Sequence, residues 1–364
     1  MNQINKIKRN SSFEILRIIS MFAIILGHFS YHGNFELQKQ LYSFNKVFLE
    51  LIQAGGDFGI NCFIMISSYF MVELKFKVEQ VIKIIYKVWT YSVGFLLLFI
   101  ILGHYNEGIY MILKSFIPIL SNIYWFATTY IIFYMLIPFI NIFINNINRK
   151  IHFRILCICL GLWCVLPTIT PFELMYNELI WFISLYIVIS YIKIYEPKID
   201  SNFKIKVVTA ILSFLLIVMS VIILTILSNK IPKLNEYITF FERRNKIPMF
   251  LFSLSIFLIF KEWNIKYNKY INILGGTTFG VYLIHDNPLV RNFLWNNLFR
   301  NNIYLNSNLL WIYSLGVALI TLFLSSIIDI SKQYTIDRLV NKLLINSRIK
   351  KIFLELIGKY LNFY

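Results

Sequence analysis

Charged residues are scarce in this chain, and acidic residues are the scarcer kind. Asp, Glu, Lys and Arg make up 15% of the 364 residues, with 18 acidic and 35 basic side chains. So small a charged share would leave the surface of soluble domains largely apolar, which excludes an ordinary soluble protein. The net charge of +17 would suggest nucleic acid in a soluble chain. Here the basic residues form short clusters between apolar runs, which predicts an anionic lipid bilayer as the partner and no nucleic acid.

Cysteine is also rare. The four cysteines, Cys62, Cys157, Cys159 and Cys164, all fall inside apolar runs, which predicts buried thiols and no disulfide framework. The first apolar run has no small-residue cleavage site at its end, so it is expected to stay in the protein as a helix and not to be removed as a signal peptide.

Hydrophobic residues, in contrast, are abundant. They make up 58% of the chain, and the mean hydropathy is +0.66. Runs of roughly 18–24 apolar residues are long enough to cross the hydrocarbon core of a bilayer. The pattern predicts an all-α integral membrane protein with about ten transmembrane helices. We expect them near 13–32, 50–72, 86–103, 123–145, 153–170, 177–195, 206–228, 247–262, 273–292 and 308–330.

The distribution of Lys and Arg predicts the orientation, because cytoplasmic loops carry the positive excess. With the N-terminus inside, the cytoplasmic segments hold 24 of the 35 basic residues and the outer loops hold 10. We therefore expect both termini in the cytoplasm and a multi-pass protein of the cytoplasmic membrane. The largest outer group goes against the trend and indicates either a functional cluster or a misplaced seventh span; it comprises Lys230, Lys233, Arg243, Arg244 and Lys246.

The domain organisation predicted from this pattern is simple. Residues 11–330 form one membrane domain, since no repeat or change of composition divides them. Residues 331–364 form a tail in which apolar residues recur at helical spacing between basic ones. A basic amphipathic helix of this kind is expected to lie on the cytoplasmic interface without crossing the membrane.

Ionisable residues inside a predicted span are candidates for function, because their burial in lipid is costly. Arg17 and His28 lie in the first span, eleven residues apart. Eleven helical steps end close to three full turns, so both side chains share one face and are separated by about 16 Å along the axis. Arg17 is then near the cytoplasmic end and His28 in the outer half. The alternative is that Arg17 reaches lipid phosphates and His28 bonds to a neighbouring helix.

Two further segments carry polar groups at membrane depth. In the second span, Asp57 and Asn61 stand one turn apart among glycines and serines that permit close helix contact. In the ninth span, His285, Asp286 and Asn287 fall near the outer end, at about the depth expected for His28.

A metal site is not expected. His32 lies one turn beyond His28, and such a pair can bind metal, but the sequence offers no obvious third ligand.

Four motifs together resemble the bacterial acyltransferase 3 family. They are Arg17-x10-His28, the NCFIMISSYF segment at 61–70, Tyr124-Trp125-Phe126, and GVYLIHDNP at 280–288. The resemblance covers about residues 11–330. The chain departs from the family where Ser68 replaces a usual glycine, and because serine is also small, helix contact should survive.

The resemblance implies an integral membrane O-acyltransferase that moves an acetyl or other short acyl group. The implied donor is cytoplasmic acyl-CoA, and the implied acceptor is a hydroxyl of a cell-surface or lipid-linked polysaccharide. Arg17 would bind a CoA phosphate, because a guanidinium matches phosphate geometry. His28 would act as general base or as acyl carrier.

The remaining candidates have less definite roles. Some are expected to orient the His28 imidazole or hold the developing oxyanion, and an aromatic residue could stack on sugar; this group comprises Asp57, Asn61, Trp125, His285, Asp286 and Asn287. The alternative from another class is a polysaccharide exporter or flippase without acyl transfer, which needs a cationic path through several helices. The predicted interiors contain Arg17 almost alone, which favours acyl transfer.

Overall fold

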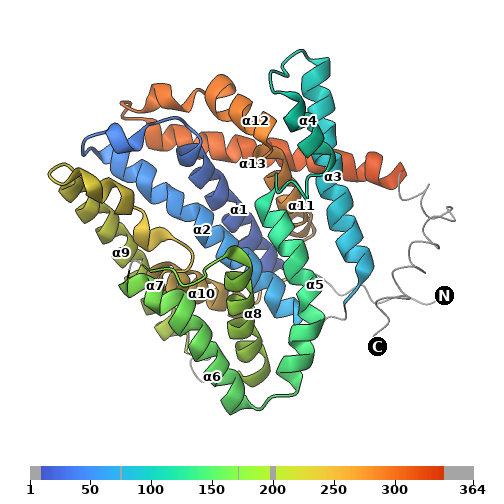
Figure 1. Ribbon diagram of the computed structural model, residues 1–364, viewed down its shortest axis with the longest axis vertical. Helices are drawn as coiled ribbons and strands as arrows, with labels where there is room; N and C mark the ends of the chain where they lie inside the picture. The colour runs from blue at the N-terminus through green and yellow to red at the C-terminus, as the bar shows by residue number, and fades with distance from the viewer. Residues whose placement is uncertain (1–9, 74–75, 171, 197–201, 340–364) are drawn as a thin grey trace.

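The computed structural model describes residues 10–73, 76–170, 172–196 and 202–339, and this part of the chain is helical without any strand (Figure 1). The helices are α1 (Ser11–Tyr31), α2 (Phe44–Met71), α3 (Val78–Ile101), α4 (Ile109–Phe116), α5 (Trp125–Asn145), α6 (Arg149–Leu160), α7 (Leu166–Ile169), α8 (Glu178–Tyr195), α9 (Phe203–Ser228), α10 (Ile247–Glu262), α11 (Lys269–His285), α12 (Pro288–Asn292) and α13 (Leu310–Tyr334). A π-helical turn, Gly161–Val165, joins α6 to α7.

Eight helical stretches of the described residues are long and apolar enough to cross a membrane. They correspond to eight of the expected spans, with α6 and α7 forming one continuous stretch. The other two expected spans correspond to α10 and α11, which are shorter at 16 and 17 residues. The chain is therefore an all-helical protein of membrane character, and the count of ten spans stays a prediction.

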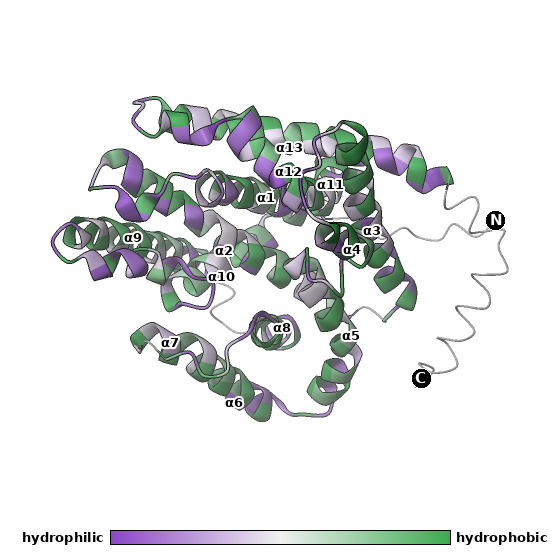
Figure 2. Cartoon of the chain, turned by 45° about the horizontal axis from the view of Figure 1, so that its top comes forward, coloured by the Kyte–Doolittle hydropathy of each residue, from purple (hydrophilic) through white to green (hydrophobic). Residues whose placement is uncertain are grey.

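The outer surfaces of the helices are apolar. On α9, Ile211, Leu215 and Leu216 are exposed, as are many other large hydrophobic side chains. Figure 2 shows hydrophobic residues along most helices and hydrophilic residues gathered in connections and at helix ends. Exposed apolar surface on this scale suits lipid and would aggregate in water.

Helix α1 lies at the centre, against α2, α10, α11 and α13. Its close packing on α2 depends on small residues. A Cβ at Gly59 would lie 2.6 Å from the carbonyl oxygen of Ser20, and one at Gly27 would lie 3.0 Å from the backbone nitrogen of Gly56. Gly55 and Gly59 form a GxxxG pair on α2, which lets two backbones approach. The glycines singled out in the second span thus hold α1 and α2 together.

Helix α11 packs on the other side of α1 and against α13. A Cβ at Gly275 would collide with the side chain of Glu14, and one at Gly280 would collide with Asp329. Asp329 is fully buried, and its carboxylate accepts hydrogen bonds from Tyr91 at 2.6 Å and from Lys87. These glycines therefore let α11 lie flush against α1 and α13.

The C-terminal end of α11 is sharply defined. Helix α11 ends at His285, and the Asn287 side chain accepts hydrogen bonds from the backbone of Leu289 and Val290, which caps α12. Pro288 opens α12, a position that suits its missing N–H. This break leaves Asp286 at the helix end, beside α1.

Part of the predicted tail is described. Helix α13 extends to Tyr334, beyond the expected end of the tenth span at 330. Residues 340–364, which carry most of the predicted amphipathic helix, lie outside the described residues.

Candidate active site

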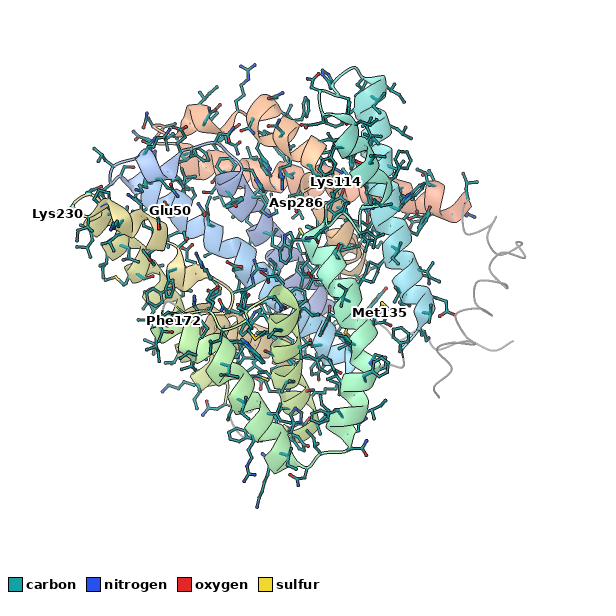
Figure 3. All side chains as sticks on the ribbon, viewed as in Figure 1. Glu50, Lys114, Met135, Phe172, Lys230 and Asp286 are labelled. Atoms are coloured by element: carbon teal, nitrogen blue, oxygen red, sulfur yellow. The ribbon has the colours of Figure 1, made fainter. Side chains whose placement is uncertain are left out.

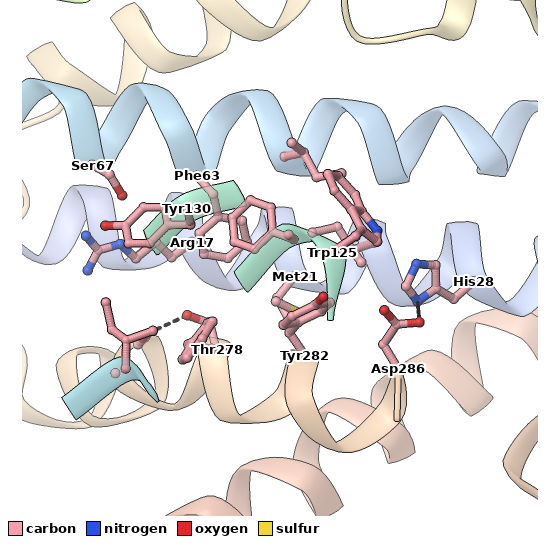
Figure 4. Close-up of a pocket in the computed structure, with 17 residues that line it drawn as sticks. Arg17, Met21, His28, Phe63, Ser67, Trp125, Tyr130, Thr278, Tyr282 and Asp286 are labelled. Carbon is pink, nitrogen blue, oxygen red and sulfur yellow. Dashed lines mark hydrogen bonds and ion pairs between the residues drawn. The ribbon is translucent and has the colours of Figure 1, made fainter. Parts of the chain in front are cut away.

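A cavity of about 270 Å³ lies between α1, α2, α5 and α11, with Ile84 of α3 on its wall. Arg17 stands at one end, beside Tyr130 and Ser67, and His28 stands at the other, beside Trp125 and Asp286 (Figure 4). The sequence placed Arg17 and His28 on one face of the first helix, and the structure directs that face into a single cavity.

The contacts of His28 define its tautomer. His28 Nδ1 lies 3.1 Å from His285 Nε2, and His285 Nδ1 lies 2.6 Å from the carbonyl oxygen of Val281. A carbonyl can only accept, so His285 donates from Nδ1 and, when neutral, accepts at Nε2. His28 must then donate from Nδ1, which leaves its Nε2 unprotonated. Nε2 makes no hydrogen bond within the described part of the chain, so its lone pair is available.

A carboxylate and a cation adjoin this histidine pair. Asp286 Oδ1 lies 3.8 Å from His28 Nδ1 and 3.9 Å from His32 Nε2. Arg291, on α12, lies 3.4 Å from the same oxygen. The Asp286 side chain is only 7% exposed, so its charge acts on the imidazoles with little screening by solvent. The helix break at 286–288 brings these groups beside α1.

Arg17, at the opposite end, has one hydrogen-bond partner among the described residues. Its Nη1 donates to Glu14 Oε1 at 2.8 Å, and the Arg17 side chain is 24% exposed. Glu14 Oε2 is buried and has no hydrogen-bond partner among the described residues. One edge of the guanidinium is thus occupied, and no described residue forms a hydrogen bond with the other edge.

The wall between Arg17 and His28 is mostly aromatic and aliphatic. Met21 and Ile24 of α1 face Phe63, Phe126 and other rings; the remaining aromatic lining residues are Trp125, Tyr130, Phe279 and Tyr282. The hydroxyl of Tyr282 is buried and makes no hydrogen bond within the described residues. A cavity of this kind suits a flexible, mainly uncharged chain with a few polar groups.

The polar pair of the second span lies elsewhere. Asp57 accepts a hydrogen bond from Arg244 Nε at 2.5 Å, and Asn61 donates to the backbone carbonyl of Arg244 at 2.9 Å. Neither residue is among those lining the cavity. We expected Asp57 or Asn61 to orient the His28 imidazole, but neither contacts it. His285 and Asp286 lie beside the imidazole instead.

Asn287 does not line the cavity either. Its side chain is buried, donates to Tyr124 Oη at 2.7 Å and caps α12. Tyr124 in turn donates to the carbonyl oxygen of Leu283 at 3.0 Å. Asn287 thereby fixes the turn that carries Asp286.

The basic group expected outside is largely paired. Arg244 bonds Glu178 at 2.8 Å as well as Asp57, and its guanidinium lies 4.8 Å from the Trp125 ring centroid. Lys246 bonds Glu173 at 3.1 Å. Helix α9 ends at Ser228, the expected end of the seventh span. Lys230, in contrast, lies at the periphery of the molecule, whereas Asp286 lies among the helices (Figure 3).

Sequence reasoning missed two residues here. Arg291 contacts the candidate residue Asp286, and Glu178 contacts Arg244 of the basic group, yet each stands at a predicted span end, where a polar side chain is commonplace. For Arg291 the sequence contains one signal of a role at the site, because this residue follows His285 and Asp286 by about a turn and a half.

Glu242, in the connection between α9 and α10, is 2% exposed, and both its carboxylate oxygens lack hydrogen-bond partners among the described residues. Burial, followed by the nearby Glu50 and Asp57, raises the pKa of Glu242 well above its ordinary value. The folded protein thus keeps a proton that the unfolded chain releases above about pH 4. The contribution of Glu242 to stability is therefore most favourable below that pH and is lost as the pH rises toward the folded pKa.

We expect Glu242→Gln to unfold at a higher temperature than the parent at pH 7, because glutamine removes this ionisation cost. The gain should shrink toward pH 4, where the parent carboxyl is protonated in both states. Thermal unfolding of the purified protein followed across this range measures the effect. Glu236→Gln, at an exposed position of the same connection, is the matched control. Equal unfolding temperatures for Glu242→Gln and the parent at every pH would contradict the prediction.

The chain was compared with known proteins. The model of the acyltransferase 3 family, described as an acyltransferase domain, matches residues 10–330. Comparison with curated proteins found no match, and comparison with solved structures found none. The family model supports a membrane acyltransferase. The chain belongs to the acyltransferase 3 family, as the motifs of its first, second, fourth and ninth predicted spans indicated.

Proposed function

We propose that this membrane acyltransferase moves an acetyl or other short acyl group from cytoplasmic acyl-CoA to a hydroxyl of a cell-surface or lipid-linked polysaccharide. The observation that carries the proposal is the single cavity with Arg17 at one end and the unprotonated nitrogen of His28 at the other. Arg17 would hold a CoA phosphate through the edge that Glu14 leaves open. The apolar wall between them would receive the pantetheine arm, along a helix separation of about 16 Å.

His28 would supply the base. Its Nε2 takes the proton of the acceptor hydroxyl, and the oxygen attacks the thioester carbonyl. The tetrahedral intermediate then collapses, the bond to sulfur breaks, and the imidazolium returns the proton to the leaving thiolate. In the alternative, Nε2 attacks the carbonyl itself and the acyl group passes through His28 to the acceptor. Both routes need the lone pair that the hydrogen bond to His285 preserves.

Two neighbours would assist this step. Asp286 lies close enough to stabilise the imidazolium that forms on His28. The Tyr282 hydroxyl, buried on the cavity wall without a partner among the described residues, would donate to the developing oxyanion. Trp125, which lines the cavity next to His28, would stack on the acceptor sugar. No metal takes part in this chemistry.

The proposal requires the Arg17 end of the cavity to face the cytoplasm. We expect an impermeant maleimide to label Gln40→Cys in intact cells and to spare Lys77→Cys until the membrane is opened. Cys157→Ser is the suitable background, because Cys157 is exposed and the other three cysteines are buried. The reverse labelling pattern would contradict the orientation and the route of the acyl group across the membrane.

Mass spectrometry of surface glycans from cells with and without the gene product tests the function. The proposal predicts an ester-linked acyl mass that is present only with the protein and is lost on mild alkaline treatment. Identical glycans in both strains would contradict it. Nothing in the described part of the chain favours the exporter alternative, which predicts a change in the amount of glycan outside and no change in its acylation.

A further inference from the structure

Three metal-ligating side chains converge at the outer end of the cavity. His28 lies in the last turn of α1, His32 caps the end of this helix four residues later, and Asp286 joins them from the end of α11. One ligand atom from each residue lies within 4.8 Å of the other two. The sequence offered the two histidines without a third ligand, and the helix break at 286–288 supplies it.

The spacing of the three atoms is close to that of a metal site. The carboxylate oxygen lies 3.8 and 3.9 Å from the two imidazole nitrogens, so a point equidistant from all three is no more than about 2.5 Å from each, against about 2.0–2.2 Å for zinc bound to histidine or carboxylate. A shift of a few tenths of an ångström in each side chain closes the difference. Two neutral imidazoles and one carboxylate suit a divalent transition metal ion.

We propose that His28, His32 and Asp286 bind such an ion, with Zn²⁺ as the fitting case, and that the bound ion inhibits acyl transfer. The atom of His28 that faces the cluster is Nδ1, the atom that now donates to His285. A metal on Nδ1 displaces that proton and leaves neutral His28 protonated on Nε2. His28 then has no lone pair for the acceptor hydroxyl. Metal binding itself is independent of the proposed function, and only the inhibition rests on it.

Arg291 is the competitor of the ion. Its guanidinium lies 3.4 Å from the Asp286 oxygen that completes the cluster, and two positive charges cannot share this buried carboxylate without cost. The ion must displace Arg291, which weakens its binding. Removing the charge of Arg291 should therefore strengthen metal binding.

The binding test uses untagged protein in detergent, with Co²⁺ as the spectroscopic probe and Zn²⁺ as its competitor. We expect one Co²⁺ per chain, with visible absorption bands that Zn²⁺ abolishes. His32→Ala should weaken binding at least tenfold, and Arg291→Gln should strengthen it. His104→Ala, an exposed histidine after α3, is the matched control and should bind as the parent does. Absence of stoichiometric binding, or equal binding by His32→Ala and the parent, overturns the site.

The inhibition test measures acyl transfer in the same preparation. Zn²⁺ should suppress transfer by the parent, EDTA should restore it, and the transfer that His32→Ala retains should be insensitive to Zn²⁺. Stoichiometric metal binding without inhibition overturns the link to His28. A preparation that binds Co²⁺ as expected but transfers no acyl group under any condition contradicts the proposed function and supports the metal site.

Discussion

Replacing His28 by glutamine is expected to lower the rate of acyl transfer by roughly 10²–10⁴-fold, the contribution usual for a positioned general base. Glutamine can keep a hydrogen bond to His285 through its amide, but it cannot accept a proton at neutral pH. His28→Ala should be at least as inactive. The measurement is transfer of a labelled acyl group to glycan in proteoliposomes, normalised to the amount of inserted protein.

The control separates chemistry from folding. His152 is a buried histidine of α6 whose Nε2 lies 3.1 Å from the carbonyl oxygen of Ile187, outside the residues that line the cavity. His152→Gln therefore tests the general cost of replacing a buried histidine and should retain transfer. If His28→Gln transfers acyl groups at a rate near that of the parent, His28 is structural, and His285 becomes the next residue to test.

Replacing Arg17 by lysine is expected to raise the KM for acyl-CoA about tenfold or more, with a much smaller change in kcat. Lysine keeps the charge but loses the forked contact to a phosphate. Loss of one charge-assisted hydrogen bond is worth about 1.5–3 kcal/mol, which corresponds to a tenfold or larger change in affinity. Steady-state kinetics with varied donor and saturating acceptor separate the two constants.

Glu14 supplies the companion test, because it holds one edge of the Arg17 guanidinium. If a donor phosphate competes with that carboxylate, Glu14→Gln should lower the KM for acyl-CoA while Arg17→Lys raises it. If Arg17 serves only to pair with Glu14, both substitutions should lower the unfolding temperature and neither should move the donor KM. That result would show that Arg17 does not bind the donor phosphate.

Much of the architecture could be predicted from the sequence because lipid imposes strict rules on length and hydropathy. The expected span at 50–72 corresponds to α2, and the expected span at 206–228 corresponds to α9. The angular register of Arg17 and His28 was predictable as well, since a helix fixes the direction of every side chain from sequence spacing alone. The family was predicted from four sequence motifs, and the family model confirms it.

The neighbours of His28 could not be predicted in the same way. His285 lies 257 positions along the chain, and depth in the membrane does not say which helices are adjacent. Asp57 and Asn61 were placed at a suitable depth, yet the side of α2 that carries them faces Arg244. Arg244 reaches them from the connection between α9 and α10, and no local pattern in the sequence reveals that packing.

The central claim is that an acyl group leaves a donor on the Arg17 side of the membrane and reaches a hydroxyl on the other side through His28. Proteoliposomes of known orientation, with labelled acetyl-CoA on the Arg17 side and surface glycan on the opposite side, test it directly. The account predicts label in the glycan with the parent protein and background label with His28→Gln. Equal labelling by the two proteins, or movement of glycan across the membrane in the absence of any donor, would contradict it.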